Sequence, residues 1–164
     1  MEINKLEPSL PNKVNILVTS EKGSKEFCEF DEESETFTLK KVLSQPFPGV
    51  YGFIPRTHHT DAEPLDVLVL SSESVRQGIV VQARPIGLIR LRGKIPDDIL
   101  IAVLLTDRVF EKTQDLLSIN KEELERLKSF LEELKEKEVE DVLDVKHARK
   151  AVEISTELYR REFE

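Results

Sequence analysis

The chain has 164 residues, of which 39% are hydrophobic and 34% are charged, and its formal net charge is −8. This balance excludes wholesale disorder and predicts a single domain over residues 1–164, since a chain of this length can bury about two thirds of its unfolded surface. The acidic surplus disfavours nucleic acid as a partner, because binding its phosphates needs clustered Lys and Arg.

We also expect no membrane partner and a cytoplasmic location. The sequence has no apolar run of bilayer length, and its start lacks the pattern of a secretory signal. Its one cysteine, Cys28, cannot form an internal disulfide.

Strand-like segments alternate with turns over roughly the first two thirds of the chain. Turn-forming clusters such as "EKGS" and "DEES" separate runs that are rich in Val, Ile, Phe and Thr. We predict strands at residues 14–19, 25–31, 35–43, 66–70, 79–93 and 98–105. Short strands at such spacing are typical of a small barrel or a sandwich.

The stretch "SQPFPGVYGFIPRTHHTDAEP", residues 44–64, breaks this pattern with four prolines and two glycines. Proline removes a backbone donor and fixes φ, so regular helix is excluded here. A long irregular segment inside a compact domain is usually functional. We therefore expect this stretch to carry part of a site.

Beyond Thr113 the pattern indicates helix. Asn120 and Glu123 have the spacing of a capping box, and apolar residues then recur every three or four positions. The stripe comprises Leu124, Leu127, Phe130, Leu131 and Leu134. A second helix is predicted over residues 145–161, with Ala148, Val152, Leu158 and Tyr159 facing inward. The chain is therefore predicted to be α+β and mainly β, a β-barrel followed by two C-terminal helices.

Three carboxylates, Asp61, Glu63 and Asp66, fall within six residues of one another. Pro64 keeps this segment extended, so a rigid turn delivers Asp66 to the head of a strand. Mg²⁺ is commonly held by a few carboxylates together with substrate phosphate, which such a turn can supply. The alternative is an ordinary Asx turn with solvated carboxylates. The neighbouring His58 and His59 are interpreted as surface residues.

The stretch "VYGFIP" followed by "HTDAEPLDVLVL" resembles the signature of the family I soluble inorganic pyrophosphatases. "FDEESETFTLKK", "GIVVQARPIGLIRL", "PDDILIAV" and "FLEELK" follow in the order and spacing of that family. The resemblance implies an OB-type closed β-barrel and Mg²⁺-dependent hydrolysis of pyrophosphate to two phosphates by a metal-activated water. It also implies a homo-oligomer, a trimer or hexamer.

The resemblance further assigns roles to residues. It implies metal ligands at Asp61, Asp66 and Asp97, with Asp98 as a close competitor for the last role. It implies catalytic groups at Glu63 and Tyr51, and substrate-binding groups at Lys41, Lys135 and Glu29.

Several positions depart from the family pattern. Glu63 is one methylene longer than the family aspartate, and Lys41 stands in place of an arginine. Five more positions lack the polar or charged residue of the family: Thr19, Phe27, Gly93, Ile99 and Leu134. The altered phosphate pocket leaves a related phosphoanhydride open as the substrate. Two other functions are also possible: a family member that has lost catalysis and acts as a metal-binding or protein-interaction subunit, and an oligonucleotide-binding barrel, which the acidic charge disfavours.

Overall fold

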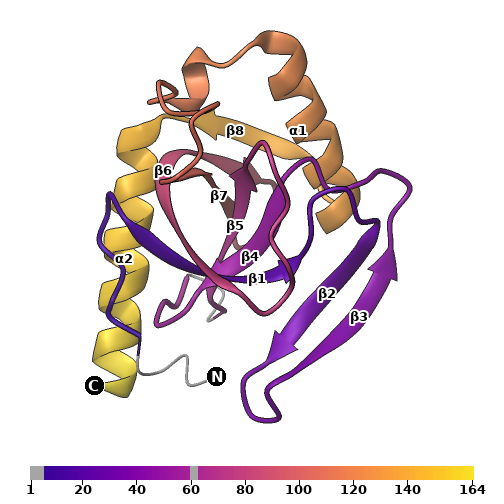
Figure 1. The fold of residues 1–164 in the computed structure, drawn as a ribbon. Helices are drawn as coiled ribbons and strands as arrows, with labels where there is room; N and C mark the ends of the chain where they lie inside the picture. Colours follow the sequence, from indigo (N-terminus) through magenta and orange to yellow (C-terminus); the bar gives the residue numbers. More distant parts are fainter. Residues whose placement is uncertain (1–5, 60–62) are drawn as a thin grey trace.

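A computed structural model describes residues 6–59 and 63–164 of the chain. In this part of the chain, five strands close into a ring (Figure 1). The order around the ring is β1 (Val14–Ser20), β4 (Val50–Ile54), β5 (Leu65–Leu70), β7 (Asp97–Leu104) and β6 (Val80–Leu91), which pairs with β1 again. The pairing of β5 with β7 is parallel, and the other pairings around the ring are antiparallel.

The long strand β6 makes this closure possible. One end of it pairs with β1, at Val80 to Ala83, while the rest pairs with β7. A further short strand, β8 (Val139–Leu143), pairs with β6 outside the ring. The predicted OB-type closed barrel with helices at the C-terminal end is confirmed.

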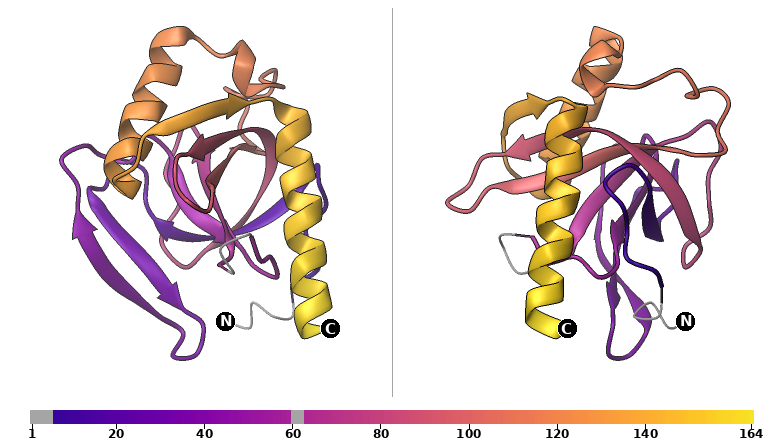
Figure 2. Two further views of the ribbon diagram at one scale, coloured as in Figure 1. Left: turned by 180° about the vertical axis from the view of Figure 1, so that it is seen from behind. Right: turned by 90° about the vertical axis from the view of Figure 1, so that its left-hand side faces the viewer.

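The remaining elements flank the barrel. The strands β2 (Glu26–Asp31) and β3 (Thr36–Val42) form a separate hairpin, whose turn points toward the end of the molecule where the C-terminus lies (Figure 1). A 3-10 turn, η2 (Leu116–Ser118), leads to α1 (Lys121–Lys135), and α2 (Val145–Phe163) runs along the outside of the barrel (Figure 2). No helix in the described residues is long and apolar enough to span a bilayer.

Two strands were missed by the sequence prediction. The strand β4 lies inside the Pro/Gly-rich stretch that we expected to be irregular, and β8 lies between the two predicted helices. Gly52 allows β4 to approach β1, because a Cβ at this position would lie 2.1 Å from the carbonyl oxygen of Leu17. The glycine that resembled a loop signal is therefore required for close strand packing.

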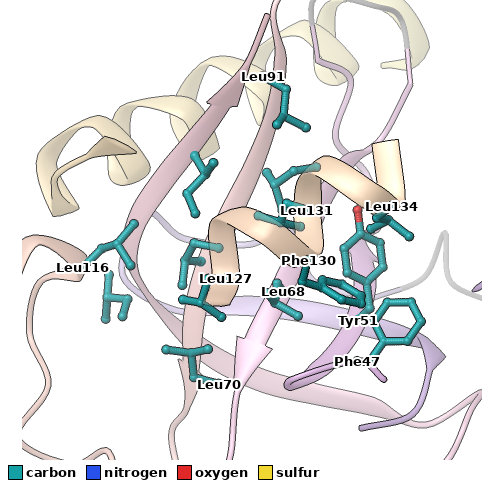
Figure 3. Packing of buried hydrophobic residues seen from close by; sticks show 14 of the residues in the cluster. Phe47, Tyr51, Leu68, Leu70, Leu91, Leu116, Leu127, Phe130, Leu131 and Leu134 are labelled. Atoms are coloured by element: carbon teal, nitrogen blue, oxygen red, sulfur yellow. The ribbon is translucent and has the colours of Figure 1, made fainter. Parts of the chain in front are cut away.

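The core forms two main clusters, one against each helix. The apolar stripe of α1 is buried against the barrel as predicted, and Figure 3 shows Phe130 and Leu134 beside Tyr51 and Phe47, with Leu127 nearer Leu68. Ala148 and Val152 of α2 pack on the second cluster, which includes Val14 and Leu100. The prediction for α2 is corrected in part: Leu158 and Tyr159 are only half-buried, because this end of the helix projects past the barrel strands.

The two α-helices begin at side-chain caps. Asn120 accepts hydrogen bonds from the backbone N–H groups of Glu122 and Glu123, at the position that the capping-box spacing predicted. Asp144 accepts one from His147 and starts α2 directly after β8. These caps satisfy backbone donors that have no partner within the helix.

Candidate active site

A cavity of about 360 Å³ lies where the barrel, the β2–β3 hairpin and the last residue of α1 meet. Its described lining has an acidic group, an aromatic group and one lysine. The acidic residues are Glu29, Glu32, Glu63, Asp66, Asp97 and Asp98, and the others include Phe27, Tyr51, Phe53, His59 and Lys135. The cavity therefore brings together residues that lie far apart in the sequence, from β1, β2, β4, β5, β7 and α1.

Tyr51 and Asp66 are placed together by the register of β4 and β5. Tyr51 pairs with Leu68, so Asp66 is its diagonal neighbour on the same face of the sheet. The Tyr51 hydroxyl donates a hydrogen bond of 2.9 Å to Asp66 Oδ2. Burial, together with the nearby Asp66 carboxylate, raises the pKa of Tyr51 well above its ordinary value, so this hydroxyl stays protonated and acts as a donor.

Lys135, the last residue of α1, reaches the same carboxylate. Its Nζ lies 2.8 Å from Asp66 Oδ2 and 6.0 Å from the centre of the Phe27 ring. Burial lowers the pKa of Lys135, but the Asp66 and Asp97 carboxylates outweigh it and the net pKa is raised. Lys135 is therefore cationic at neutral pH. Within the described residues, both hydrogen bonds to the Asp66 carboxylate reach Oδ2.

Asp97 and Asp98 begin β7 and differ sharply in their surroundings. The Asp98 side chain is 4% exposed, and its carboxylate accepts hydrogen bonds from the Arg90 guanidinium at 2.8 and 3.2 Å. Burial raises the pKa of Asp98, but the hydrogen bonds from His59 and Arg90 outweigh this effect. The net pKa is therefore lowered, and the carboxylate is ionised. Asp97 instead lies 3.4 Å from Lys137 Nζ and is 18% exposed. Of the two, Asp97 has the carboxylate with fewer protein contacts.

His59 corrects one sequence interpretation. We interpreted it as a surface residue, but its side chain is 10% exposed and lines the cavity. Its Nε2 lies 2.9 Å from Asp98 Oδ2 and its Nδ1 lies 3.2 Å from Ser155 Oγ. His58 points elsewhere, with Nδ1 2.6 Å from Glu162, and is 17% exposed. Local sequence gives no signal for His59, because its partners are 39 and 96 residues away along the chain.

The other predicted site residues are placed unevenly. Glu63 and Glu29 line the cavity, and the Glu29 carboxylate lies 3.9 Å from Lys40 at the exposed rim. Lys41 is not among the lining residues, since its Nζ donates a hydrogen bond to the Glu133 carbonyl at the end of α1. Asp61 lies outside the described residues.

The substituted positions fall into two groups. Phe27 and Thr19 line the cavity, where the Phe27 ring packs on Tyr51 and the Thr19 hydroxyl donates to the Tyr51 carbonyl. Ile99 of β7 and Leu134 of α1 are buried in the core. Gly93 falls in neither group, since it is exposed and does not line the cavity. Of these substituted residues, Phe27 therefore adds an apolar surface to the acidic cavity.

The donor chemistry of this cavity fits a divalent cation. Six of the described lining residues are carboxylates, and Lys135 is the one Lys or Arg among them. Hard cations such as Mg²⁺ prefer carboxylate oxygens, and a site with only one or two of them suffices when water and phosphate complete the shell. The described residues contain no group of three metal-ligating side chains at bonding distance, so an ion would take part of its shell from water or substrate.

A closed barrel with an acidic cavity, in which Tyr51 and Lys135 hold the Asp66 carboxylate, defines a class of protein suited to binding cations. The sequence pattern of the inorganic pyrophosphatase family matches residues 16–161. The chain belongs to this family.

Individual relatives agree with this assignment. A soluble inorganic pyrophosphatase of Zea mays is 35% identical over 93% of this chain and 75% of its own length. An inorganic pyrophosphatase of Haloferax volcanii is 32% identical over 95% of this chain and 93% of its own. The solved structure of the Helicobacter pylori inorganic pyrophosphatase superimposes with a TM-score of 0.88 at 29% identity, covering 95% of this chain and 99% of that one.

Proposed function

We propose that this protein hydrolyses inorganic pyrophosphate to two phosphates with the help of Mg²⁺. The observation that carries the proposal is the Asp66 carboxylate, held by Tyr51 and Lys135 inside an acidic cavity. Family membership supports the proposed reaction, and this cluster supports the cavity as the place where it would occur.

The metal ligands proposed are Asp61, Asp66 and Asp97. Asp97 is preferred to Asp98 because the Asp98 carboxylate already accepts hydrogen bonds from Arg90 and His59. Bound Mg²⁺ supplies positive charge that offsets the charge of the substrate and lowers the pKa of a coordinated water. The Asp66 and Asp97 carboxylates raise the pKa of Lys135, so a cation bound at this site would share Asp66 with a charged lysine.

Glu63 is proposed as the group that takes the proton of the attacking water, because it is a carboxylate on the cavity wall directly before Asp66's strand. General base catalysis requires such a carboxylate within hydrogen-bond reach of the water. Tyr51 is a protonated donor that orients Asp66 and can also face a phosphate oxygen.

Substrate contacts are proposed for Lys135, Lys41 and Glu29. Lys135 supplies a charged hydrogen-bond donor for a phosphate oxygen. Glu29 lines the cavity at its rim, and its proposed role in substrate binding follows from the family resemblance. Lys41 would have to leave the Glu133 carbonyl to reach substrate. Because cations are scarce in the described lining, pyrophosphate binding depends on metal charge more than on side-chain charge.

The test is phosphate release from pyrophosphate by the purified protein, with Mg²⁺ and then with a chelator in excess. We expect release only with Mg²⁺, and a loss of about 100-fold or more in Asp66→Asn, the order seen when one charge-stabilising group is removed. Asp141→Asn on the exposed side of β8 is the matched control and should retain activity. No release from the parent protein under any divalent metal would instead support the catalytically impaired alternative.

Three broader properties complete the proposal. A single domain over residues 1–164, a trimeric or hexameric assembly and a cytoplasmic location are proposed on family resemblance and composition. Light scattering after size-exclusion chromatography measures the assembly, and a monomer at micromolar concentration would contradict it.

A further inference from the structure

The two side chains that donate to Asp66 come from elements that also meet outside the cavity. Tyr51 belongs to β4 and Lys135 is the last residue of α1, and both donate to the same carboxylate oxygen. The position of the Lys135 ammonium depends on the last turn of α1, and helix ends fray readily. What holds this last turn therefore bears on the cavity.

Glu133, two residues before Lys135, forms a polar link between α1 and the segment that leads into β4. Its Oε2 accepts the backbone N–H of Ser44 at 2.6 Å, and its Oε1 accepts the Ser44 hydroxyl at 2.9 Å and Gln45 Nε2 at 3.1 Å. Hydrogen bonds to an ionised carboxylate are roughly twice as strong as those between neutral groups. Because donors reach both oxygens, the link fixes the direction of the carboxylate as well as its distance.

Two further contacts hold the same turn. The Glu133 carbonyl is one of the last four of α1, which have no partner within the helix, and it accepts Lys41 Nζ of β3 at 3.0 Å. Glu132 Oε2 accepts the backbone N–H of Val139 in β8 at 2.8 Å. The last turn of α1 is therefore attached to β3, to β8 and to the segment before β4.

The core joins α1 to the same segment through an aromatic pair. The ring centres of Phe47 and Phe130 are 4.8 Å apart. Apolar packing is not directional, and Phe130 lies more than one turn before Lys135. Glu133 lies in the same turn as Lys135, so its directional contacts act where the ammonium is placed.

We propose that Glu133 is a positioning residue, which holds the last turn of α1 against the segment before β4 so that Lys135 stays within reach of Asp66 and of a phosphate oxygen. The inference rests on the proposed function, in which Lys135 binds a phosphate of the substrate. Glu133 does not line the cavity, whereas Lys135 of the same turn does. Glu133 therefore acts on the substrate through Lys135.

The experiment is a double-mutant cycle that combines Glu133→Ala with Lys135→Met. Methionine keeps an unbranched apolar side chain at this position but removes the charge. The readouts are the Kd of inorganic phosphate, by titration calorimetry with Mg²⁺ in excess, and KM and kcat for pyrophosphate. Glu125→Ala is the matched control, because it makes the same change at an exposed position of α1, where the carboxylate lies 3.4 Å from Lys128.

We expect Glu133→Ala to weaken phosphate binding and to raise KM, each by about threefold or more, as for coupled residues of one network. In the Lys135→Met background the same change should alter either quantity by less than about 1.5-fold, because the ammonium that Glu133 positions is absent. Glu133→Gln retains an acceptor for the Ser44 N–H and should recover most of the loss. Glu125→Ala should match the parent.

An equal effect of Glu133→Ala in both backgrounds would overturn the proposal, because a general disturbance of α1 does not require Lys135. Glu133→Ala with the same phosphate Kd and KM as Glu125→Ala would also overturn it. A Lys135→Met protein with parental Kd and KM would exclude Lys135 as the group that Glu133 positions. A parent that neither binds phosphate nor hydrolyses pyrophosphate would overturn the proposed function itself, and this inference with it.

Ser44→Ala combined with Gln45→Ala provides a second test if Glu133→Ala does not fold. The pair removes two side-chain donors to Glu133 and leaves the sequence of α1 intact. We expect a smaller weakening of phosphate binding, which again disappears in the Lys135→Met background. A parental phosphate Kd in this variant, or an equal loss in both backgrounds, would contradict the positioning role.

Discussion

Glu63 is the proposed general base, and its side chain is one methylene longer than the aspartate of the family pattern. We expect Glu63→Gln to lower kcat by about 100-fold or more with little change in KM, because the amide cannot accept the proton of the attacking water. Glu63→Asp keeps a carboxylate and should retain far more activity than the glutamine variant. Steady-state phosphate release measures both, and equal rates in the two variants would exclude Glu63 as the base.

Local sequence predicts the residues of this cavity only where a motif carries them. Tyr51 and Asp66 belong to one continuous stretch, and the structure brings them into hydrogen-bond contact. His59 lies in the same stretch but depends on Asp98 and Ser155, which no local pattern connects to it. Burial of a polar side chain is a long-range property, so the surface interpretation failed for His59.

At the scale of elements, the cap of α1 makes a separable contribution to stability. Asn120→Ala removes the acceptor for two backbone N–H groups and should cost about 1 kcal/mol of unfolding free energy. For a chain of this size, that loss corresponds to about 2–4 °C in Tm. Thermal unfolding followed by circular dichroism measures it. Lys121→Ala, at the next and exposed position, is the control and should leave Tm within about 1 °C.

Glu133 links α1 to the segment before β4 in a pH-dependent way. Its carboxylate accepts the backbone N–H of Ser44 at 2.6 Å and hydrogen bonds from the side chains of Ser44 and Gln45. The Ser44 backbone contact leads the effects that hold the pKa of Glu133 below its ordinary value. The folded state therefore prefers the ionised form, and the stabilisation exists above the unfolded pKa and disappears as pH falls through the lowered folded pKa.

The expected result follows from that sign. Glu133→Gln should be less stable than the parent near pH 7, and the difference in Tm should shrink toward zero below the ordinary pKa of a glutamate. Paired melts from pH 7 to pH 3 measure it. A difference that stays constant across this range would mean that packing, and not the carboxylate charge, accounts for the loss.

Elements were predicted best where a periodic pattern was long. The stripe of α1 extends over about three turns and was placed correctly, together with its cap. The strands β4 and β8 were missed because each has only five residues. In addition, Pro48, Gly49 and Gly52 in and before β4 are residues typical of loops. What makes β4 a strand is its pairing with β1 and β5 on either side, which is tertiary information.

For the whole molecule, closure of the barrel determines where the site forms. The ring brings the starts of β5 and β7 together through their parallel pairing, so Asp66 lies opposite Ile99 and close to Asp97. The spacing of the predicted strands could not distinguish a barrel from a sandwich, because both folds consist of several short strands connected by turns. The pattern of the whole chain led us to predict a barrel, and the resemblance to the family agreed with that prediction. The pairing of β1 with β6 is the feature that distinguishes a closed barrel from a sandwich.

The convergence of carboxylates at this point predicts that Mg²⁺ stabilises the entire fold. A cation that binds only the folded state at 100 times its Kd adds about 2.7 kcal/mol of unfolding free energy. For a chain of this size, we expect Tm to rise by about 5–10 °C when Mg²⁺ is added to the metal-free protein. Differential scanning calorimetry with NaCl at matched ionic strength separates this effect from screening of the net charge of −8.

Asp66→Asn decides whether the stabilisation arises at the proposed site. This variant removes the carboxylate that Tyr51 and Lys135 hold, so we expect Mg²⁺ to raise its Tm by less than about 2 °C. Asp141→Asn carries the same change of charge on exposed β8 and should show the full parental shift. An undiminished shift in Asp66→Asn would locate the stabilising ion elsewhere on this acidic surface and would separate metal binding from the cavity in which hydrolysis is proposed.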